Sequence, residues 1–341
     1  MYVPVKTKEG KQLMPTAPPV ARHLIKSGKA TPYWSNGIFC IRLNYETIDY
    51  TQDIVVGVDP GSQKEGFTVK SEAHTYLNVQ ADAHNKVGKK VEKRRESRRS
   101  RRSRKCPNRK HRKNRNAGKE KIPAGTRARW DWKLRILDWL SKLYPITHIC
   151  VEDIKARTIP RAKKWNQSFS PLEVGKEWFY TEIRKRWELL TLQGWETKEI
   201  RDRLGLKKTS NKLSETFSAH CVDSWCLAHH TVGGVSMPEN TAIFCIAPIP
   251  IKRRCLHREQ EAKGRQRNRY GGTVLGNGLV KNTLIKHVKY GLTRLAGVNA
   301  KGLFSIYTLE GKRLTTGAKR NDFSVLTRLN FNYRSGHSSP S

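Results

Sequence analysis

The chain has 341 residues and carries 67 Lys and Arg against 29 Asp and Glu, a formal charge of +38. This length suits a sizeable core divided among two or three modules, and the charge excess indicates a polyanionic partner. The longest uncharged apolar stretch, Asn240 to Ile251, is too short to cross a bilayer, so no transmembrane helix is predicted. The seven cysteines are an odd number without a C-x-x-C pair, which predicts reduced thiols in a cytoplasmic protein and no disulfide framework.

The first elements that the sequence predicts are β-strands between residues 53 and 85. The run IVVGVDPGSQKEGFTV and the following HTYLNVQ are rich in β-branched residues and are interrupted by Pro-Gly and Gly. This pattern predicts a strand, a tight turn and two further strands. Asp59 ends the first apolar run, directly before Pro60 and Gly61.

The next segment is strongly basic. Between Lys86 and Lys121 there are 19 Lys and Arg against three acids. The run KRRESRRSRRSRK at 93–105 permits a helix, but like charges three and four residues apart repel one another. A helix that is basic on all sides cannot be held by a core, so we expect it to become ordered on phosphates. The alternative is a solvated tail or localisation signal. The residues expected to bind these phosphates are Arg94, Arg95, Arg98, Arg99, Arg101, Arg102, Arg104 and Lys105.

Helical patterns dominate the middle of the chain. WDWKLRILDWLSKLYP has apolar positions at helical spacing and stops at Pro145, and THICVEDI after it predicts a short buried strand that carries Glu152. The stretch 171–205 is predicted to be helical with a break around Gly194, and 212–230 is predicted as a further helix.

Acidic residues stand at three points of these apolar elements. Asp59 and Glu152 each end a strand, and Asp223 follows His220 by three residues, which puts both on one face of the helix predicted over 212–230. Two strands and a helix can thus bring three carboxylates and an imidazole to one point. Mg²⁺ prefers such oxygen ligands, and two ions, with Mn²⁺ as a substitute, would hold the attacking water and the leaving oxygen of a phosphodiester. No zinc spacing is found in the nearby Cys221, Cys226, His229 and His230.

The tail from about Lys252 opens with KRRCLHREQEAKGRQRNRYGG. It continues as short alternating runs that are separated by Gly and polar turns. These runs predict a small separate β-barrel or β-meander.

Several motifs resemble known families. VGVDPGSQKEGFTV, HICVEDI and AHCVDSW resemble the three separated motifs of the RuvC nucleases, whose RNase H-like fold puts the first Asp and the Glu on neighbouring strands of a mixed sheet. GKQLMPTAPPVARHLIKSGKA resembles the PLMP segment of the insertion-sequence proteins IscB and IsrB, with Gln12 in place of the first Pro. The arginine run at 93–105 resembles their bridge helix, and the stretch from SPLEVGKEWFYTEI to AHCVDSW is similar to their central region. The resemblance covers roughly residues 10–230 and, more loosely, the tail.

IscB-like proteins carry an HNH nuclease between the second and third RuvC motifs. Residues 153–219 contain neither His nor Cys, whereas an HNH site needs His as general base and metal ligand. The chain therefore resembles IsrB, the relative without HNH. This resemblance implies a transposon-associated, RNA-guided nickase that acts as a monomer in a ribonucleoprotein, with a long omega-type guide RNA and double-stranded DNA as partners and no membrane.

The resemblance also implies roles for particular residues. Asp59, Glu152 and Asp223 would hold Mg²⁺, and His220 would position or deprotonate the attacking water. The tail would read a short duplex motif beside the target. The candidates for that reading, among which the sequence does not choose, are Arg265, Arg267, Arg269, Lys286, Lys289, Arg294 and Lys301.

The expected fold class is α/β, an RNase H-like mixed-sheet core in three segments with a basic bridge helix and a small C-terminal β-rich module. The expected divisions are 1–52 for the PLMP-like segment, 53–85 for RuvC segment I, 86–121 for the bridge helix and basic loop, 122–170 for RuvC segment II, 171–211 for a helical connector in place of HNH, 212–251 for RuvC segment III, and 252–341 for the basic linker and motif-reading module.

Two other functions remain open at this level. An RNA-independent Holliday-junction resolvase would use the same carboxylates, but it leaves the bridge-like helix and the tail without a role. A noncatalytic RNA-binding protein with a decayed nuclease fold would not need the Asp, Glu and His-x-x-Asp set.

Overall fold

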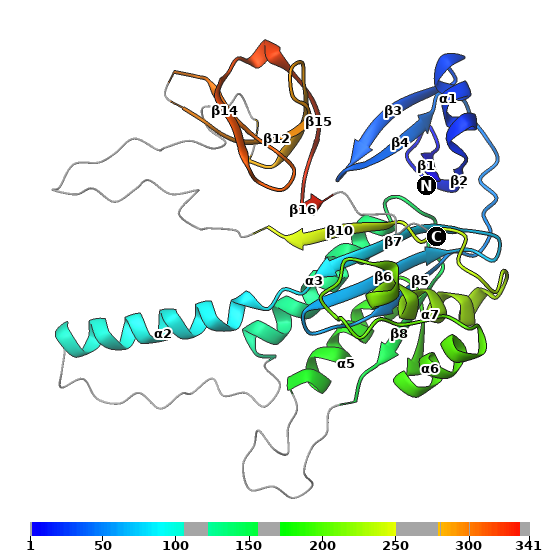
Figure 1. Cartoon of the computed structure of the whole chain (residues 1–341), viewed down its shortest axis with the longest axis horizontal. Coiled ribbons are helices and arrows are strands. Elements are labelled where there is room, and N and C mark those ends of the chain that lie inside the picture. Colours follow the sequence, from blue (N-terminus) through cyan, green and yellow to red (C-terminus); the bar gives the residue numbers. More distant parts are fainter. Residues whose placement is uncertain are drawn as a thin grey trace, which may run out of the picture.

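The computed structural model of the chain describes residues 2–105, 122–155, 171–249, 279, 281–299 and 301–334. Its strands form three sheets, and the largest, with seven strands, lies at the centre (Figure 1). The seven strands are β5 (Val55–Asp59), β6 (Lys64–Lys70), β7 (Thr75–Asp82), β8 (His148–Asp153), β9 (Glu188–Gln193), β10 (Ile243–Pro248) and β16 (Phe331–Arg334).

The order of these strands defines an RNase H-like sheet. The strands run β16-β10-β7-β6-β5-β8-β9, and β6 is antiparallel to both of its neighbours. On the other side of β5, the strands β8 and β9 continue in parallel. The core order β7-β6-β5-β8-β9 is thus third, second, first, fourth and fifth along the chain, with the second strand reversed. The predicted α/β fold with an RNase H-like core is confirmed.

Helices cover both faces of this sheet. On one face lies α7 (Val222–Val232), with α6 (Gly194–Arg203) beside it, and on the other lie α3 (Ala124–Leu140) and α5 (Pro171–Arg184). Side chains of a strand alternate between the two faces. In β5, Val56 and Val58 therefore pack in the cluster of α3, whereas Val55 packs in the cluster of α7. The predicted strands around Asp59 and Glu152 and the helix before Pro145 are confirmed by β5 to β8 and α3.

One predicted helical stretch is helical at both ends, as α5 and α6, but is wrong in its middle. The expected helical connector over 171–211 contains the strand β9, which pairs in parallel with β8 through residues such as Leu192 opposite Glu152. Its sequence ELLTLQ suits a helix by propensity, but the exposed edge of β8 supplies the backbone partners of a strand. This segment therefore completes the central sheet.

A second prediction needs correction at the start of the helix expected over 212–230. The structure has a π-helical turn at Phe217–Cys221, and α7 begins only at Val222. Thr216 before this turn has an extended backbone. A π-turn widens one turn of the helix and changes the direction of the side chains it contains.

The two other sheets are separate from the central sheet. The N-terminal one has the order β2-β1-β4-β3 and packs with a short helix. The C-terminal one has the order β14-β13-β12-β11-β15, which confirms the expected β-rich module, although β16 after it returns to pair with β10. The elements of these two parts are β1 (Val3–Lys6), β2 (Gln12–Thr16), α1 (Pro18–Lys26), β3 (Ala30–Ser35), β4 (Ile38–Leu43), β11 (Thr283–His287), β12 (Gly291–Val298), β13 (Phe304–Tyr307), β14 (Arg313–Ala318), the 3₁₀ turn Arg320–Asp322 and β15 (Phe323–Arg328).

The basic run forms the helix α2 (Lys86–Lys105), which projects away from the rest of the chain (Figure 1). Every residue of this helix from Gly88 through Arg104 is exposed. Within the described ranges, no helix combines the length and the hydrophobicity that a bilayer crossing requires.

Candidate active site

Asp59 and Glu152 lie side by side at the ends of two parallel strands. The register pairs Val58 of β5 with Val151 of β8, so the next positions along the two strands are Asp59 and Glu152. Both follow the alternation that points Val55 and Cys150 toward α7. The two carboxyl groups therefore share the α7 face of the sheet.

Two glycines, Gly57 in β5 and Gly66 in β6, allow α7 and the π-turn before it to approach the sheet. A Cβ atom at Gly57 would stand 1.8 Å from the Ser224 carbonyl oxygen, and one at Gly66 would stand 2.4 Å from the His220 carbonyl oxygen. Backbone thus packs against backbone without intervening side chains. The approach buries His220 and Asp223, which are 7% and 1% exposed, near the ends of β5 and β8.

His220 connects Asp59 to the loop before the π-turn. Its Nδ1 lies 2.9 Å from Asp59 Oδ2, and its Nε2 lies 3.0 Å from the Lys212 carbonyl oxygen. Both partners are acceptors, so both ring nitrogens donate when the Asp59 carboxyl is ionised. Burial opposes this charge, but the hydrogen bond and the charge of Asp59 outweigh it and raise the pKa of His220. In this arrangement His220 orients Asp59, and while both of its ring nitrogens donate it has no free lone pair with which to act as a base.

Glu152 experiences the crowding of negative charge most strongly. Burial raises its pKa, the charge of Asp59 and a hydrogen bond with it add to the rise, and Asp223 adds more, to a value of about 8. Carboxyl groups that raise one another's pKa must lie close together. Asp59, Glu152 and Asp223 therefore form one electrostatic cluster.

Asp223 is held by two cations that the sequence analysis did not identify. Arg201 of α6 donates from Nη1 to Asp223 Oδ1 at 2.5 Å, and the Lys208 ammonium group pairs with Asp223 Oδ2. The Asp223 side chain is 2% exposed, whereas Arg201 and Lys208 are 14% and 32% exposed. The two cations thus approach the buried carboxylate from the surface side. The only signal in the sequence was the lysine pair at 207–208, which is common on any basic surface.

The donor set has the chemistry of a divalent-ion site. Three clustered carboxylates supply the oxygen ligands that Mg²⁺ prefers. The pKa of Glu152 is raised by burial and then by repulsion from Asp59 and Asp223, and a bound cation would relieve that repulsion. Even so, no three acidic, His or Cys side chains of the described chain are arranged as a ready metal-binding group. Both Asp223 oxygens already contact cations, and these bonds take the ligands that an ion would need.

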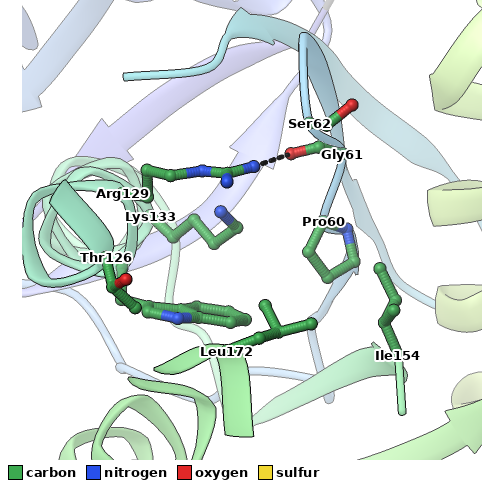
Figure 2. A pocket seen from close by; sticks show the side chains of 9 residues that line it. Pro60, Gly61, Ser62, Thr126, Arg129, Lys133, Ile154 and Leu172 are labelled. Atoms are coloured by element: carbon green, nitrogen blue, oxygen red, sulfur yellow. Dashed lines mark hydrogen bonds between the residues drawn. The ribbon is translucent and has the colours of Figure 1, made fainter. Parts of the chain in front are cut away.

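A small cavity lies on the opposite face of the same strand ends (Figure 2). It has a volume of about 280 Å³, and its lining includes Pro60 and Gly61 after β5, Ile154 after β8, and Arg129 and Lys133 of α3. Arg129 donates to the Gly61 carbonyl oxygen at 3.4 Å.

Beside this cavity, α3 is joined to β6 by a buried ion pair. Lys133 Nζ lies 2.7 Å from Glu65 Oε1, and the two side chains are 3% and 0% exposed. Burial raises the pKa of Glu65, and Lys133 counteracts part of that rise. The sequence signal for this pair was the single acid inside the apolar run KEGFTVK.

The expected RNA-binding side chains of α2 do not approach the carboxylates. Arg94, Arg95, Arg98, Arg99, Arg101, Arg102 and Arg104 are all exposed, and Lys105 ends the helix. Arg98 donates from Nε to the Arg94 carbonyl oxygen at 3.2 Å, within the helix itself. The helix therefore presents its guanidinium groups to solvent.

The candidates for reading a DNA motif are dispersed. Arg265, Arg267 and Arg269 lie outside the described residues, whereas Lys286 and Lys289 are exposed at β11 and the turn after it. Arg294 instead bonds to the Thr308 carbonyl oxygen at 3.1 Å and to Asn332 Oδ1 at 2.6 Å. These contacts give Arg294 a structural role between the C-terminal module and β16.

The cysteines near α7 are buried in its core cluster. Cys221 and Cys226 are free and pack with Trp225. Burial raises the pKa of Cys226 to about 12, so its metal-binding thiolate form is disfavoured. The indole of Trp225 stacks on His229 with the ring centroids 4.9 Å apart. This packing agrees with the sequence argument against zinc.

Comparisons with known proteins found one family and a similar solved structure. Residues 3–164, just under half of the chain, match the family described as RRXRR protein. The matched region contains Arg98-Arg99-Ser100-Arg101-Arg102 in α2. Among solved structures, the chain is similar to Thermus thermophilus RuvC, described as "T. thermophilus RuvC in complex with Holliday junction substrate", at 12% identity and a TM-score of 0.28, covering 53% of this chain and 97% of that one. No curated protein matches.

Proposed function

We propose that this chain is a metal-dependent nuclease that nicks the displaced strand of a DNA target selected by a guide RNA. The observation that carries the proposal is the convergence of Asp59, Glu152 and Asp223 at the ends of β5 and β8, with His220 bonded to Asp59. The resemblance of the motifs to RuvC, and of the chain to IsrB, supports the same reaction.

In this proposal Asp59, Glu152 and Asp223 hold Mg²⁺. When bound, the ion supplies charge neutralisation at the phosphodiester and lowers the pKa of a coordinated water. The protein supplies the remaining organisation. His220 orients the Asp59 carboxylate through Nδ1, and its own ring is held by the Lys212 carbonyl oxygen. In this role His220 positions a ligand, and proton transfer from water falls to another group.

The helix α2 supports the RNA part of the proposal. Its exposed arginines form an array of phosphate-binding groups that the core of the protein does not satisfy. A guide RNA would bind along this helix, and the complex would work as one protein chain with one RNA. In the C-terminal module, Lys286 and Lys289 are exposed and remain candidates for contacting the duplex beside the target.

A purification and cleavage experiment tests this function. The protein, expressed with its native flanking DNA, should retain a discrete long RNA, and that complex should convert a matching supercoiled plasmid to the open-circular form in Mg²⁺. A plasmid with a scrambled target is the control. Cutting of a four-way junction without RNA would support a resolvase instead. Retained RNA without any cutting would indicate a noncatalytic RNA-binding protein.

A further inference from the structure

At the proposed site, Arg201 and Lys208 compete with a metal ion for the carboxylate oxygens of Asp223. Its two carboxylate oxygens contact Arg201 and Lys208, and the side chain is almost fully buried. A metal ion that uses Asp223 must replace at least one of these contacts. In the described structure, protein cations therefore hold both carboxylate oxygens of Asp223.

The helix α6 holds this arrangement over the carboxylates. Arg201 lies seven residues after Gly194, which places both on the same face of the helix. A Cβ atom at Gly194 would stand 3.0 Å from Glu152 Oε1. One face of α6 thus covers Glu152 with its first turn and reaches Asp223 with its last.

The two cations also add positive charge to the carboxylate cluster. Arg201 and Lys208 both contact Asp223, which lies beside Asp59 and Glu152. A divalent ion that enters this cluster is repelled by both cations while the two Asp223 contacts persist. If the metal ion displaces these contacts, Arg201 and Lys208 need another anion as their partner.

A nucleic-acid strand supplies that anion. Guanidinium and ammonium groups bind phosphate oxygens as well as carboxylates, and Arg201 and Lys208 both reach the site from its exposed side. We infer that Arg201 and Lys208 are ligands of the backbone phosphates of the cut strand, and that their transfer from Asp223 to the strand frees Asp223 for the metal ion. This inference rests on the proposed nuclease function.

The consequence is a coupling between the binding of a nucleic-acid strand and the binding of the metal ion. If a bound strand removes the cations from Asp223, it strengthens metal binding, and the metal strengthens strand binding by the same factor. Metal would then enter mainly when a strand is present, which would protect other nucleic acid from unguided cutting. Coupling of this kind is typically about 5- to 150-fold.

Manganese affinity measures the coupling directly, without cleavage. Mn²⁺ is titrated into the full-length protein and followed by electron paramagnetic resonance, with and without a phosphorothioate single-stranded oligonucleotide that resists hydrolysis. Asp223→Ala protein under the same conditions gives the background from the oligonucleotide and the protein surface. The double variant Arg201→Gln/Lys208→Gln removes the competing cations. The double variant Arg203→Gln/Lys207→Gln removes the same charge from exposed positions of the same segment.

We expect the oligonucleotide to strengthen Mn²⁺ binding by about tenfold in the wild type and in Arg203→Gln/Lys207→Gln. Arg201→Gln/Lys208→Gln should bind Mn²⁺ more tightly than the wild type without the strand, and the strand should add little. The single variant Lys208→Gln keeps Arg201 on Asp223, and its Mn²⁺ affinity should change in the same direction by a smaller factor. This variant still tests the inference if the double variant fails to fold.

Two results would overturn the inference. One is equal Mn²⁺ affinity of the wild type, Lys208→Gln and Arg201→Gln/Lys208→Gln without the strand. The other is an unchanged effect of the strand in those variants. If Asp223→Ala itself binds Mn²⁺ as well as the wild type, the proposed metal site is wrong. If it loses the ion while the cation variants behave as wild type, only the coupling is wrong.

Discussion

Gly57 and Ser224 bring β5 and α7 into backbone contact, since a Cβ atom at Gly57 would stand 1.8 Å from the Ser224 carbonyl oxygen. Asp59 lies two residues after this glycine, and Asp223 lies directly before this serine. The close approach therefore sets the distance between the strand carboxylates and the two segments that carry His220 and Asp223, the π-turn and α7. Any side chain at position 57 must push α7 away.

The substitution Gly57→Ala tests this contact. We expect it to lower the free energy of unfolding by at least about 1–3 kcal/mol, the range typical of overpacking a core. It should also abolish nicking in protein that remains folded. Gly297→Ala in β12 is the matched control, because nothing lies within 4 Å of its added Cβ. Chemical denaturation and plasmid nicking report the two effects, and wild-type values for both would contradict the role of the contact.

Substitution of the three carboxylates should reduce DNA cleavage without preventing DNA binding. Asp59→Ala, Glu152→Ala and Asp223→Ala are each expected to reduce nicking by more than about 100-fold, because even partners outside the metal ligands commonly cost about 10- to 100-fold. RNA-dependent DNA binding should persist, since phosphate contacts provide most of it. Ca²⁺ should support binding with little cleavage. Near wild-type cutting by one variant would remove that residue from the site.

The number of strands cut follows from the absence of His and Cys over 153–219. A supercoiled target should accumulate as open circle, with the nick in the strand that is not paired with the guide. Mapping of the cut ends by primer extension locates the nick. Linear product at early times would reveal a second active site.

The helix α2 should depend on RNA for its order. Replacing Arg94, Arg98, Arg101 and Arg102 together with Gln should weaken guide-RNA binding. It should also flatten the log-log salt dependence by up to about three units, at about 0.7–0.9 per phosphate contact. A control variant removes the same charge from four exposed sites elsewhere, Lys26, Lys29, Lys198 and Arg203.

Hydrogen exchange adds an independent test of α2. Residues 93–105 should exchange quickly in the RNA-free protein, because no core packing opposes local opening of this exposed helix, and they should become protected in the complex. Protection without RNA would indicate that the helix packs on protein.

Glu152 predicts a pH dependence of stability in metal-free protein. Its pKa is about 8 in the folded protein, against 4.5 for an unperturbed Glu side chain. Between these values the folded protein retains a proton that the unfolded chain has lost, so stability decreases as pH rises from about 4.5 to about 8. Glu152→Gln should lack this decrease. Urea unfolding of both proteins with EDTA, at pH 5, 6.5 and 8, measures the difference, and parallel curves would contradict the raised pKa.

Removing only one charge of the buried ion pair between Lys133 and Glu65 should strongly destabilise the protein. Lys133→Met leaves Glu65 without its cation and is expected to cost about 3–5 kcal/mol of stability. Replacing both partners, as Lys133→Met/Glu65→Leu, should recover most of that loss because no buried charge remains. Denaturant midpoints of the wild type, the single variant and the double variant give the loss of stability in each. Equal losses in the two variants would argue against a buried ion pair that is costly to break on one side.

Local patterns predicted the parts of this fold whose structure depends on near neighbours. Short apolar runs rich in β-branched residues located β5 and β8, and with them the positions of Asp59 and Glu152. The density of like charge identified α2 as a helix without a core, and it is exposed. Both properties are contained in a few consecutive residues, so no knowledge of distant contacts was needed.

Other features depended on residues far apart in the chain. ELLTLQ is a strand because the edge of β8 pairs with it in parallel, and the tail returns as β16 because the edge of β10 pairs with it in antiparallel orientation. Lys133 reaches Glu65 across 68 positions, and Arg201 reaches Asp223 across 22. A charge in a basic sequence gives no indication of its partner, since only burial makes a particular pairing favourable. The cations on Asp223 were therefore visible only once α6 and α7 were packed together.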